Sequence, residues 1–586
     1  MKEKELSFEI EETEDSEQDI FDLDKSLQES PKIPLTTDPI IESEEESSKE
    51  VFEHKKSKKS WQDKVKEKTI SWIKNPWNLA FLVVLFLGIA IRLKYFNMES
   101  IWNDAAVHLW YAIKVTREPL FMFSRDYLLG DHVVPQTITA FYYLFTKNAF
   151  IAGKLMALTY SIVGIIFMYL LGTEIKNKKF GFIATTLFTF NHLFWFYGVR
   201  PLADAPLTVM VVLLLYLVVK LEKKNSIFWG FVTGTIFLLS MATKQQAVVF
   251  LFAYVIYLII FKRKDFLKKS ILISYGFPSV LIIFASITFQ SNFLSVAIMR
   301  IINLIGVKDG LLYVYNHLLW IFGWKLLILV GIGFIFTIIF KKEKLYFSMV
   351  LFLVYAIYLE LGVNTVEDRI VMPLLSAGLL LATFALFEIS SYISIILKNK
   401  KIVFPLVLII VLFFSWQSYA LGDPLIQGKS NSYGGHIEAG QWIQDHISNK
   451  NAILFAGSPR IVRAFAEMEY GGPPNSQGDK GGSLWFLRDF RYMGTTQRFE
   501  LEDPEKGRQA FEEDVMELSQ NHEVYLEIDV WEYTQPSWYF PINQDSINYF
   551  VNLGFVPVKI VEREVNTQQG LQKIPVIFIF KKEKVE

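Results

Sequence analysis

The stretch FIAGKLMALTYSIVGIIFMYLLG, residues 150–172, is apolar almost throughout. A helix rises about 1.5 Å per residue, so a run of this length can cross the hydrocarbon core of a bilayer. The sequence therefore predicts a polytopic all-α membrane bundle with about eleven transmembrane helices, built from this run and others like it. The expected spans are approximately Trp77–Tyr95, Phe150–Gly172, Phe180–Tyr197, Ala205–Val219, Ile227–Met241, Ala247–Phe261, Ile271–Phe289, Leu318–Phe340, Leu345–Gly362, Ile370–Ile396 and Ile402–Ala420.

The composition agrees with a membrane protein. The 586 residues are 52% hydrophobic and 16% aromatic, and the mean hydropathy is +0.29. A soluble domain is usually less apolar, because its loops and surface dilute the core. The net charge of -1 averages over very different segments and implies nothing about partners. Cysteine is absent, which excludes a disulfide framework and a thiolate metal site.

The chain is expected to have three parts. Residues 1–75 should form a disordered cytoplasmic tail, acidic in IIESEEESSKE and then basic in KKSKKSWQDKVKEK, with no secretory signal peptide. Residues 76–421 should form the transmembrane domain, with a long first outer loop at 97–134. Residues 422–586 have a soluble composition and predict a C-terminal α/β domain.

Lysine and arginine in the loops predict the orientation, because basic loops stay in the cytoplasm. With the basic tail inside, every second loop should be basic, and EIKNKK, KLEKKN, FKRKDFLKK, KKEK and KNKK all are. The chain is therefore predicted to be a multi-pass protein of the cell membrane with a cytoplasmic N-terminus. An odd number of spans puts the C-terminal domain on the extracytoplasmic side.

The unusual polar residues all gather on the predicted outer side. Polar groups close to apolar spans are costly unless they are used, so this one-sidedness indicates an external active face. The residues concerned are Asp104, His108, Asp131, His132, Arg200, Asp204, Lys244, Gln245, Glu367, Asp368 and Arg369.

Four of these residues lie in the first outer loop, and two of them, Asp104 and His132, allow two interpretations each. Asp104 belongs to a predicted amphipathic interfacial helix and shares a face with His108 and Tyr111, but it is equally consistent with a simple helix cap supplied by Asn103 or Asp104. His132 precedes Pro135 and is either a ligand or proton carrier, or a solvated loop residue.

The residues at the later span ends are also ambiguous. Arg200 and Asp204 form either a local salt bridge or part of a site. Lys244 is either a snorkelling side chain or a phosphate contact, and its place on the outer side favours phosphate. Arg369 is suited to bidentate phosphate binding. Its neighbours Glu367 and Asp368 should point in different directions, so that the three cannot all pair.

Five segments resemble the GT-C superfamily of integral membrane glycosyltransferases, in particular the protein O-mannosyltransferase and aminoarabinose transferase-like family. They extend the similarity from Trp77 to about Ile396. The segments are WNDAAVHLWYAI after the first span, GDHVVPQTITAFYYLF, VRPLADAP with its Arg–x–x–x–Asp spacing, GTIFLLSMATK, and RIVMPLL.

The resemblance implies a polyprenyl-phosphate sugar donor, such as dolichyl phosphate mannose. It implies catalytic carboxylates at Asp104 and Asp204 and phosphate-binding residues at Lys244 and Arg369. The further candidates are, for substrate, Arg200, His132 and Gln245, and in a second tier His108, Asp131, Glu367 and Asp368. Two departures, Asn103-Asp104 for the family's paired acids and Val134-Pro135 for its Pro-Pro, leave a divalent metal cofactor undecided.

These residues support an inverting transfer of a sugar to a protein, lipid or glycan acceptor on the extracytoplasmic face, within membrane lipids and without nucleic acid. Asp104 would act as general base, and Lys244 and Arg369 would stabilise the leaving phosphate. Two alternatives stay open. One is a transporter or flippase for a polyprenyl-linked substrate, although no internal repeat is visible. The other is a non-catalytic glycosylation subunit.

Overall fold

The computed structural model describes residues 67, 69–98, 101–124, 127, 132–288, 313–362, 367–430, 432–447, 452–467, 469–470, 486–489, 504–531, 538–567 and 570–584. Residues 1–66 of the predicted tail, the candidate Asp131 and residues 471–485 of the Gly-rich segment lie outside this part of the chain.

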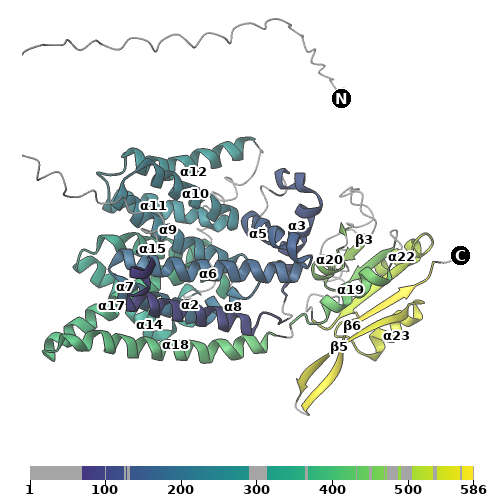
Figure 1. Ribbon diagram of the computed structural model, residues 1–586. Coiled ribbons are helices and arrows are strands. Elements are labelled where there is room, and N and C mark those ends of the chain that lie inside the picture. The colour runs from purple at the N-terminus through teal and green to yellow at the C-terminus, as the bar shows by residue number, and fades with distance from the viewer. Residues whose placement is uncertain are drawn as a thin grey trace, which may run out of the picture. The chain divides into compact units, whose positions relative to one another are not determined.

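Seven of the described helices are long and apolar enough to cross a membrane, and they lie together in one bundle (Figure 1). Each corresponds to one of the predicted spans. They are α2 (Pro76–Lys94), α6 (Ala149–Ile175), α9 (Asp204–Lys224), α14 (Tyr313–Ile339), α15 (Glu343–Gly362), α17 (Pro373–Ile396) and α18 (Val403–Gly428).

The other four predicted spans are also helical, but their continuous apolar helices are shorter, and for α12 (Lys269–Thr288) this apolar part is Lys269–Phe284. The expected span at 180–197 is two helices, α7 (Lys178–Phe190) and α8 (His192–Gly198). The break falls at Asn191, whose side-chain oxygen accepts hydrogen bonds from the N–H groups of Leu193 and Phe194 in the first turn of α8. The remaining three are α10 (Ile227–Thr243), α11 (Val248–Phe261), which follows the short 3-10 helix η2 (Gln245–Ala247), and α12 (Lys269–Thr288).

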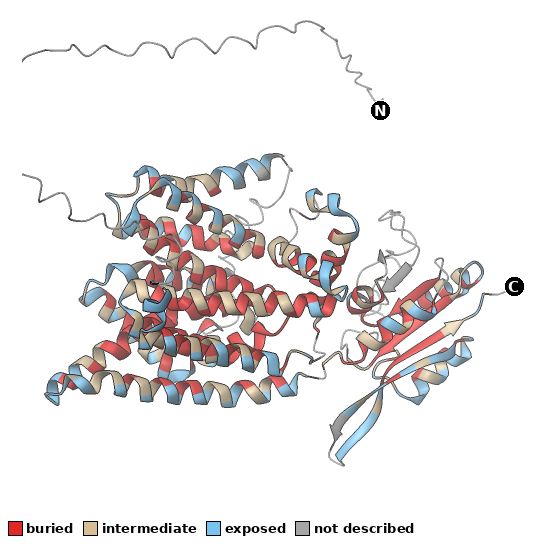
Figure 2. Cartoon of the chain, in the orientation of Figure 1, coloured by how far each residue is buried: buried red, intermediate tan, exposed pale blue. Residues whose placement is uncertain are grey.

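Burial differs strongly among the membrane helices, as Figure 2 shows. Helices α9 and α17 are enclosed by other helices, whereas α18 keeps most of its surface exposed. Lipid tails are as apolar as the helices, so helix contacts depend on close backbone approach at small residues. Gly333 of α14 provides such a contact, because an added methyl group would overlap the backbone carbonyl of Leu381 in α17.

The predicted helix of the first outer loop is present as α3 (Asn103–Arg117), followed by η1 (Pro119–Phe123) and α5 (Val133–Thr146). Two details of the prediction are wrong. Trp102 is the N-cap and makes no side-chain cap bond, so Asp104 is a first-turn residue and does not cap the helix. The apolar side is covered by protein, because Trp110 and Ile113 are buried where α3 packs against α5, α6 and the C-terminal helix α20.

The C-terminal region is a six-stranded sheet with flanking helices, which confirms the predicted α/β class. The strand order is β2-β3-β1-β4-β6-β5, parallel from β2 to β4 and antiparallel for β6 and β5. The strands are β1 (Ile453–Ala456), β2 (Glu469–Tyr470), β3 (Phe486–Asp489), β4 (Val524–Asp529), β5 (Val556–Thr567) and β6 (Gly570–Lys582). The helices are α19 (His436–His446), α20 (Pro459–Ala466), α22 (Pro504–Ser519) and α23 (Gln544–Asn552).

Two boundaries differ from expectation. Helix α18 continues past the change in composition at Asp423 and ends only at Gly428. The segment PRIVRAFAEMEYGG, residues 459–472, predicts a helix that ends at a glycine, but α20 ends at Ala466. Glu467 then takes a left-handed conformation, with φ 53°, and the chain enters β2. Propensity did not indicate this stop, because glutamate is unusual in that conformation.

Candidate active site

Asp104 and Arg369, which are far apart in sequence, form a direct ion pair. A terminal nitrogen of Arg369 lies 2.7 Å from Oδ2 of Asp104, and Nε of the same guanidinium pairs with Glu367. Arg369 belongs to the short helix α16 (Asp368–Val371), which leads into α17. About half of the Asp104 side chain is exposed, whereas Arg369 is largely covered. The carboxylate is therefore open to an incoming molecule.

Asp204 and Lys244 form a second and more deeply buried pair. Nζ of Lys244 donates a hydrogen bond of 2.6 Å to Oδ1 of Asp204. Asp204 is the first residue of α9 and Lys244 is the C-cap of α10, so the contact between these helices brings the charges together. Of the two interpretations that the sequence left open for Arg200 and Asp204, this contact favours a site, because Asp204 pairs with Lys244 from another helix.

The two pairs belong to one cluster. Burial lowers the pKa of Arg369, but the negative charges of Asp204, Asp104 and Glu367 outweigh this effect and raise it, so the guanidinium stays charged. Asp204 in turn lies within electrostatic range of Lys244, Arg369 and His132. Acids and bases from α3, α9, α10 and α16 therefore meet in one place.

Two histidines line the same cluster. The rings of His108 and His132 stand perpendicular, with centroids 4.5 Å apart. Nδ1 of His132 bonds to the carbonyl of Thr243 at 2.9 Å, which fixes the ring to the end of α10 and argues against a solvated loop residue. Burial, followed by the charges of His132, Lys244 and Arg369, holds the pKa of His108 well below its usual value. His108 is therefore neutral near pH 7.

The remaining candidates lie around this core. Arg200 is buried, donates a hydrogen bond of 2.8 Å to the carbonyl of Phe196 and stacks on the ring of that residue. Trp102 lies next to both arginines, with its ring 5.5 Å from Arg200 and 5.8 Å from Arg369. Gln245 follows Lys244 at the start of η2. Asp131 is outside the described residues.

The expectation for the three adjacent charges was only partly right. Glu367 pairs with its neighbour-but-one Arg369, which the sequence argument had not foreseen. Asp368 points elsewhere and pairs with His317 of α14.

Sequence reasoning missed His317, Trp102 and Arg460. His317 lies just before a predicted span, at its outer end, so the same one-sidedness that selected the other candidates would have included it. Arg460 belongs to α20 of the C-terminal domain, and its Nη1 lies 3.8 Å from Oδ1 of Asp104. Nothing in the sequence pattern links Arg460 to Asp104, because their contact depends on how α20 packs on α3.

Metal ligation was left undecided by the sequence. Among the residues that the structure describes, three His, Asp or Glu side chains come close enough to share a metal ion only in the C-terminal domain. The cluster around Asp104 instead balances its carboxylates with arginine and lysine. The described residues of this cluster therefore support a reaction in which arginine and lysine side chains stabilise negative charge.

Comparisons with known proteins agree with this picture. Residues 132–289 match the family model for dolichyl-phosphate-mannose-protein mannosyltransferase. No match was found among curated proteins.

Two solved structures share the fold. The apo structure of ArnT from Cupriavidus metallidurans aligns with a TM-score of 0.52 and 11% identity, over 85% of this chain and 97% of that one. The oligosaccharyltransferase of Archaeoglobus fulgidus, also in its apo form, aligns with a TM-score of 0.52 and 12% identity, over 78% and 70% of the two chains. The chain is therefore similar over residues 132–289 to the mannosyltransferase family and shares the fold of ArnT and of the archaeal oligosaccharyltransferase, in agreement with the resemblance to GT-C glycosyltransferases seen in the sequence.

Proposed function

We propose that this protein is a glycosyltransferase that moves a sugar from a polyprenyl phosphate to an acceptor hydroxyl or amide, with Asp104 as general base. The observation that carries the proposal is the ion pair between Asp104 and Arg369, next to the Lys244–Asp204 pair. The half-exposed Asp104 carboxylate thus lies against the Arg369 guanidinium, and the Lys244 ammonium belongs to the same cluster of charges. A lipid phosphate as donor is supported by similar structures, since ArnT was solved with undecaprenyl phosphate and the archaeal enzyme AglB with a dolichol-phosphate.

The reaction needs a proton acceptor on one side of the sugar and positive charge on the other. The Asp104 carboxylate takes the proton of the acceptor, whose oxygen or nitrogen forms a bond to the anomeric carbon. The bond from that carbon to the phosphate oxygen breaks, and its electron pair leaves with the polyprenyl phosphate. Arg369 and Lys244 stabilise this negative charge in a partly dehydrated site, where such interactions are strong.

Inversion at the anomeric carbon follows from the same residues. A retaining enzyme usually needs a second carboxylate as nucleophile, close to the sugar. The other acid of the cluster, Asp204, is almost fully buried and is bonded to Lys244. We therefore assign Asp204 the task of holding the Lys244 ammonium in place, and Asp104 alone acts on the acceptor.

The test is transfer of a labelled sugar in proteoliposomes, with a polyprenyl-phosphate donor and candidate protein, lipid and glycan acceptors. Asp104→Asn should lower kcat by about 10²–10⁴-fold, the usual contribution of a general base, while the donor still binds. Asp265→Asn is the matched control, because Asp265 pairs with Lys268 in the turn before α12, away from the cluster. Its rate should equal that of the wild type.

The same assay separates the alternatives. Full transfer by Asp104→Asn would remove this residue from the mechanism. Movement of the donor between leaflets without transfer would indicate a flippase. Neither activity, with any donor or acceptor, would indicate a non-catalytic subunit.

A further inference from the structure

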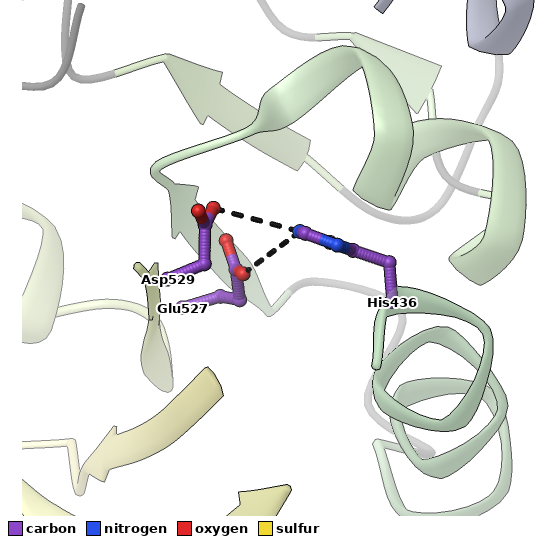
Figure 3. Close-up of side chains that lie close together, drawn as sticks. All are labelled: His436, Glu527 and Asp529. Carbon is purple, nitrogen blue, oxygen red and sulfur yellow. Dashed lines mark ion pairs between the residues drawn. The ribbon is translucent and has the colours of Figure 1, made fainter. Parts of the chain in front are cut away.

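The C-terminal domain contains a second cluster of titratable residues, which the proposed transfer reaction does not use. His436 is the first residue of α19, and Glu527 and Asp529 lie on β4 (Figure 3). Residues two apart on a strand point to the same side, so both carboxylates face the histidine. All three side chains are completely buried.

The three side chains are aimed at a common point. Nε2 of His436 lies 3.5 Å from Oε1 of Glu527 and 3.5 Å from Oδ2 of Asp529 (Figure 3). The far atom of each group is fixed by the backbone. Nδ1 of His436 donates a hydrogen bond of 2.9 Å to the carbonyl of Tyr433, Oε2 of Glu527 accepts one from the N–H of Gly457, and Oδ1 of Asp529 accepts one from the N–H of Trp531. Outer hydrogen bonds of this kind orient the ligands of protein-bound metals.

The side-chain atoms that face the centre of the cluster lack the close hydrogen bonds that buried polar atoms normally make. Nε2 of His436 and Oε1 of Glu527 are fully buried, and apart from the ion pairs at 3.5 Å within this cluster neither atom has a hydrogen-bond partner. Leaving a buried polar atom unsatisfied costs about 1–3 kcal/mol, and more if the group is charged. Two carboxylates that face one point inside a protein therefore call for a positive charge between them.

The distances between Nε2 of His436 and the two carboxylate oxygens indicate whether a metal ion or a shared proton lies between these groups. A charged N–H···O⁻ bond is about 2.7–2.9 Å long, so 3.5 Å is too long for an imidazolium that bonds to both acids. Ligands about 2.1 Å from a tetrahedral zinc ion lie about 3.4 Å from one another. The two separations from Nε2 of His436 are 3.5 Å and match the second arrangement, and all three ligand atoms lie within 4.8 Å of one another.

The chemical type of the ligand atoms limits which metal ions the cluster can bind. Calcium and magnesium take oxygen ligands, and an imidazole nitrogen disfavours them. One imidazole and two carboxylates suit zinc and neighbouring divalent transition metals. Ser458 is completely buried beside the Gly457 N–H that holds Glu527, and its hydroxyl hydrogen-bonds to Asp529. A fourth ligand can come from this hydroxyl or from a water molecule.

We propose that His436, Glu527 and Asp529 form a binding site for one divalent transition-metal ion, zinc in the first place. Since the site is closed to solvent, its role is structural. It links the start of α19 to the end of β4 and to the turn that leads into α20.

This position connects the proposed metal to the candidate active site. Arg463 of α20 lies over the ring of Trp110 in α3 at 4.3 Å, and Arg460 of α20 reaches Asp104. An ion that fixes the turn before α20 would therefore fix the side of the C-terminal domain that contacts α3. The binding of the ion does not depend on the proposed transfer reaction.

The test measures metal in the full chain. Protein purified in detergent is incubated with Zn²⁺, freed of excess metal and analysed by mass spectrometry of elements. We expect about one zinc per chain in the wild type and less than a tenth of that in Glu527→Gln. His446→Gln is the matched control, because His446 ends the same helix, and its Nδ1 bonds to the carbonyl of Trp442 at 3.0 Å. This variant should keep its zinc.

A second measurement does not depend on how well the variants fold. Co²⁺ added to the wild type should give the strong visible absorption of a tetrahedral site, and Zn²⁺ should displace it. Absence of both this spectrum and stoichiometric zinc in the wild type would overturn the proposal. Equal zinc in the wild type and in a Glu527→Gln protein that elutes as a folded monodisperse species would overturn it as well.

Discussion

Asp204 keeps only 4% of its side chain exposed, so its charge depends on the ammonium group of Lys244. Removing one partner of a buried ion pair leaves an uncompensated charge, which costs more than the intact pair contributes. The position of this pair at the ends of α9 and α10 explains why neither residue has to be in a loop to serve the site.

Lys244→Met should therefore lower the free energy of unfolding by about 3–5 kcal/mol. Adding Asp204→Asn should recover part of this loss, because the second change removes the buried charge. Thermal unfolding in detergent of the wild type, both single variants and the double variant gives the coupling energy. Lys268→Met is the control, since its pair with Asp265 is exposed and should contribute below about 1 kcal/mol. Additive effects of the two changes at the buried pair would contradict the prediction.

His108 should make the protein sensitive to mild acid. Burial keeps the folded imidazole neutral, whereas the unfolded one takes up a proton as the pH falls through about 6.5. The unfolded state then binds more protons, so stability decreases below about pH 6.5, by at most about 1.4 kcal/mol per pH unit. Melting temperatures between pH 5 and 7.5 should fall less steeply in His108→Gln than in the wild type. Identical slopes would show that His108 titrates normally.

The sequence predicted which residue types would gather but not which would pair. The position of polar residues at outer span ends was enough to select Asp104, Asp204, Lys244 and Arg369, because such residues are costly near a membrane unless they are used. Their partners depend on helix packing, which residue type does not encode. The contact of Arg460 with Asp104 could not be predicted for the same reason.

At the scale of elements, helix contacts determine the geometry of the site. Every predicted span is helical in the structure, because a long apolar run leaves the backbone few other ways to satisfy its hydrogen bonds in lipid. The break between α7 and α8 was missed, since a hydropathy average does not register that Asn191 caps a new helix within an apolar run. The end of α20 at Glu467 was missed because a left-handed glutamate runs against local preference.

The α14–α17 contact offers a matched pair of glycines. An added methyl at Gly333 would overlap the backbone of Leu381, whereas one at Gly331, two residues earlier, would meet nothing within 4 Å. Gly333→Ala should therefore destabilise the protein by about 1–3 kcal/mol, as overpacking usually does. Gly331→Ala should be neutral or stabilising, because alanine favours a helix. Thermal unfolding in detergent compares the two, and equal effects would contradict the close contact.

At the scale of the whole molecule, the predicted orientation remains to be measured. The alternation of basic loops supports a cytoplasmic N-terminus and an extracytoplasmic C-terminal domain. The hydrophobic bundle and the α/β class of the C-terminal domain followed from composition and periodicity. The docking of α20 on α3 did not, because it joins segments far apart in the chain.

The absence of native cysteine makes the orientation directly testable. Gln544→Cys introduces an exposed thiol in α23 of the C-terminal domain, and Lys224→Cys introduces one at the end of α9 in a predicted cytoplasmic loop. A membrane-impermeant maleimide added to intact cells should label the first variant but not the second. After the cells are opened, both should react. The reverse pattern in intact cells would place the active face in the cytosol.

The double engagement of Arg369 has a kinetic consequence. Its guanidinium is held by Asp104 and Glu367 together, and a phosphate that binds the terminal nitrogen now paired with Asp104 has to displace that carboxylate. Displacing Asp104 frees the base only when the donor is in place, which imposes a compulsory order with the donor first. An unreactive acceptor analogue should then inhibit uncompetitively against the donor, and mixed inhibition would indicate random addition. An order of this kind would also keep the carboxylate from activating water before a sugar is present.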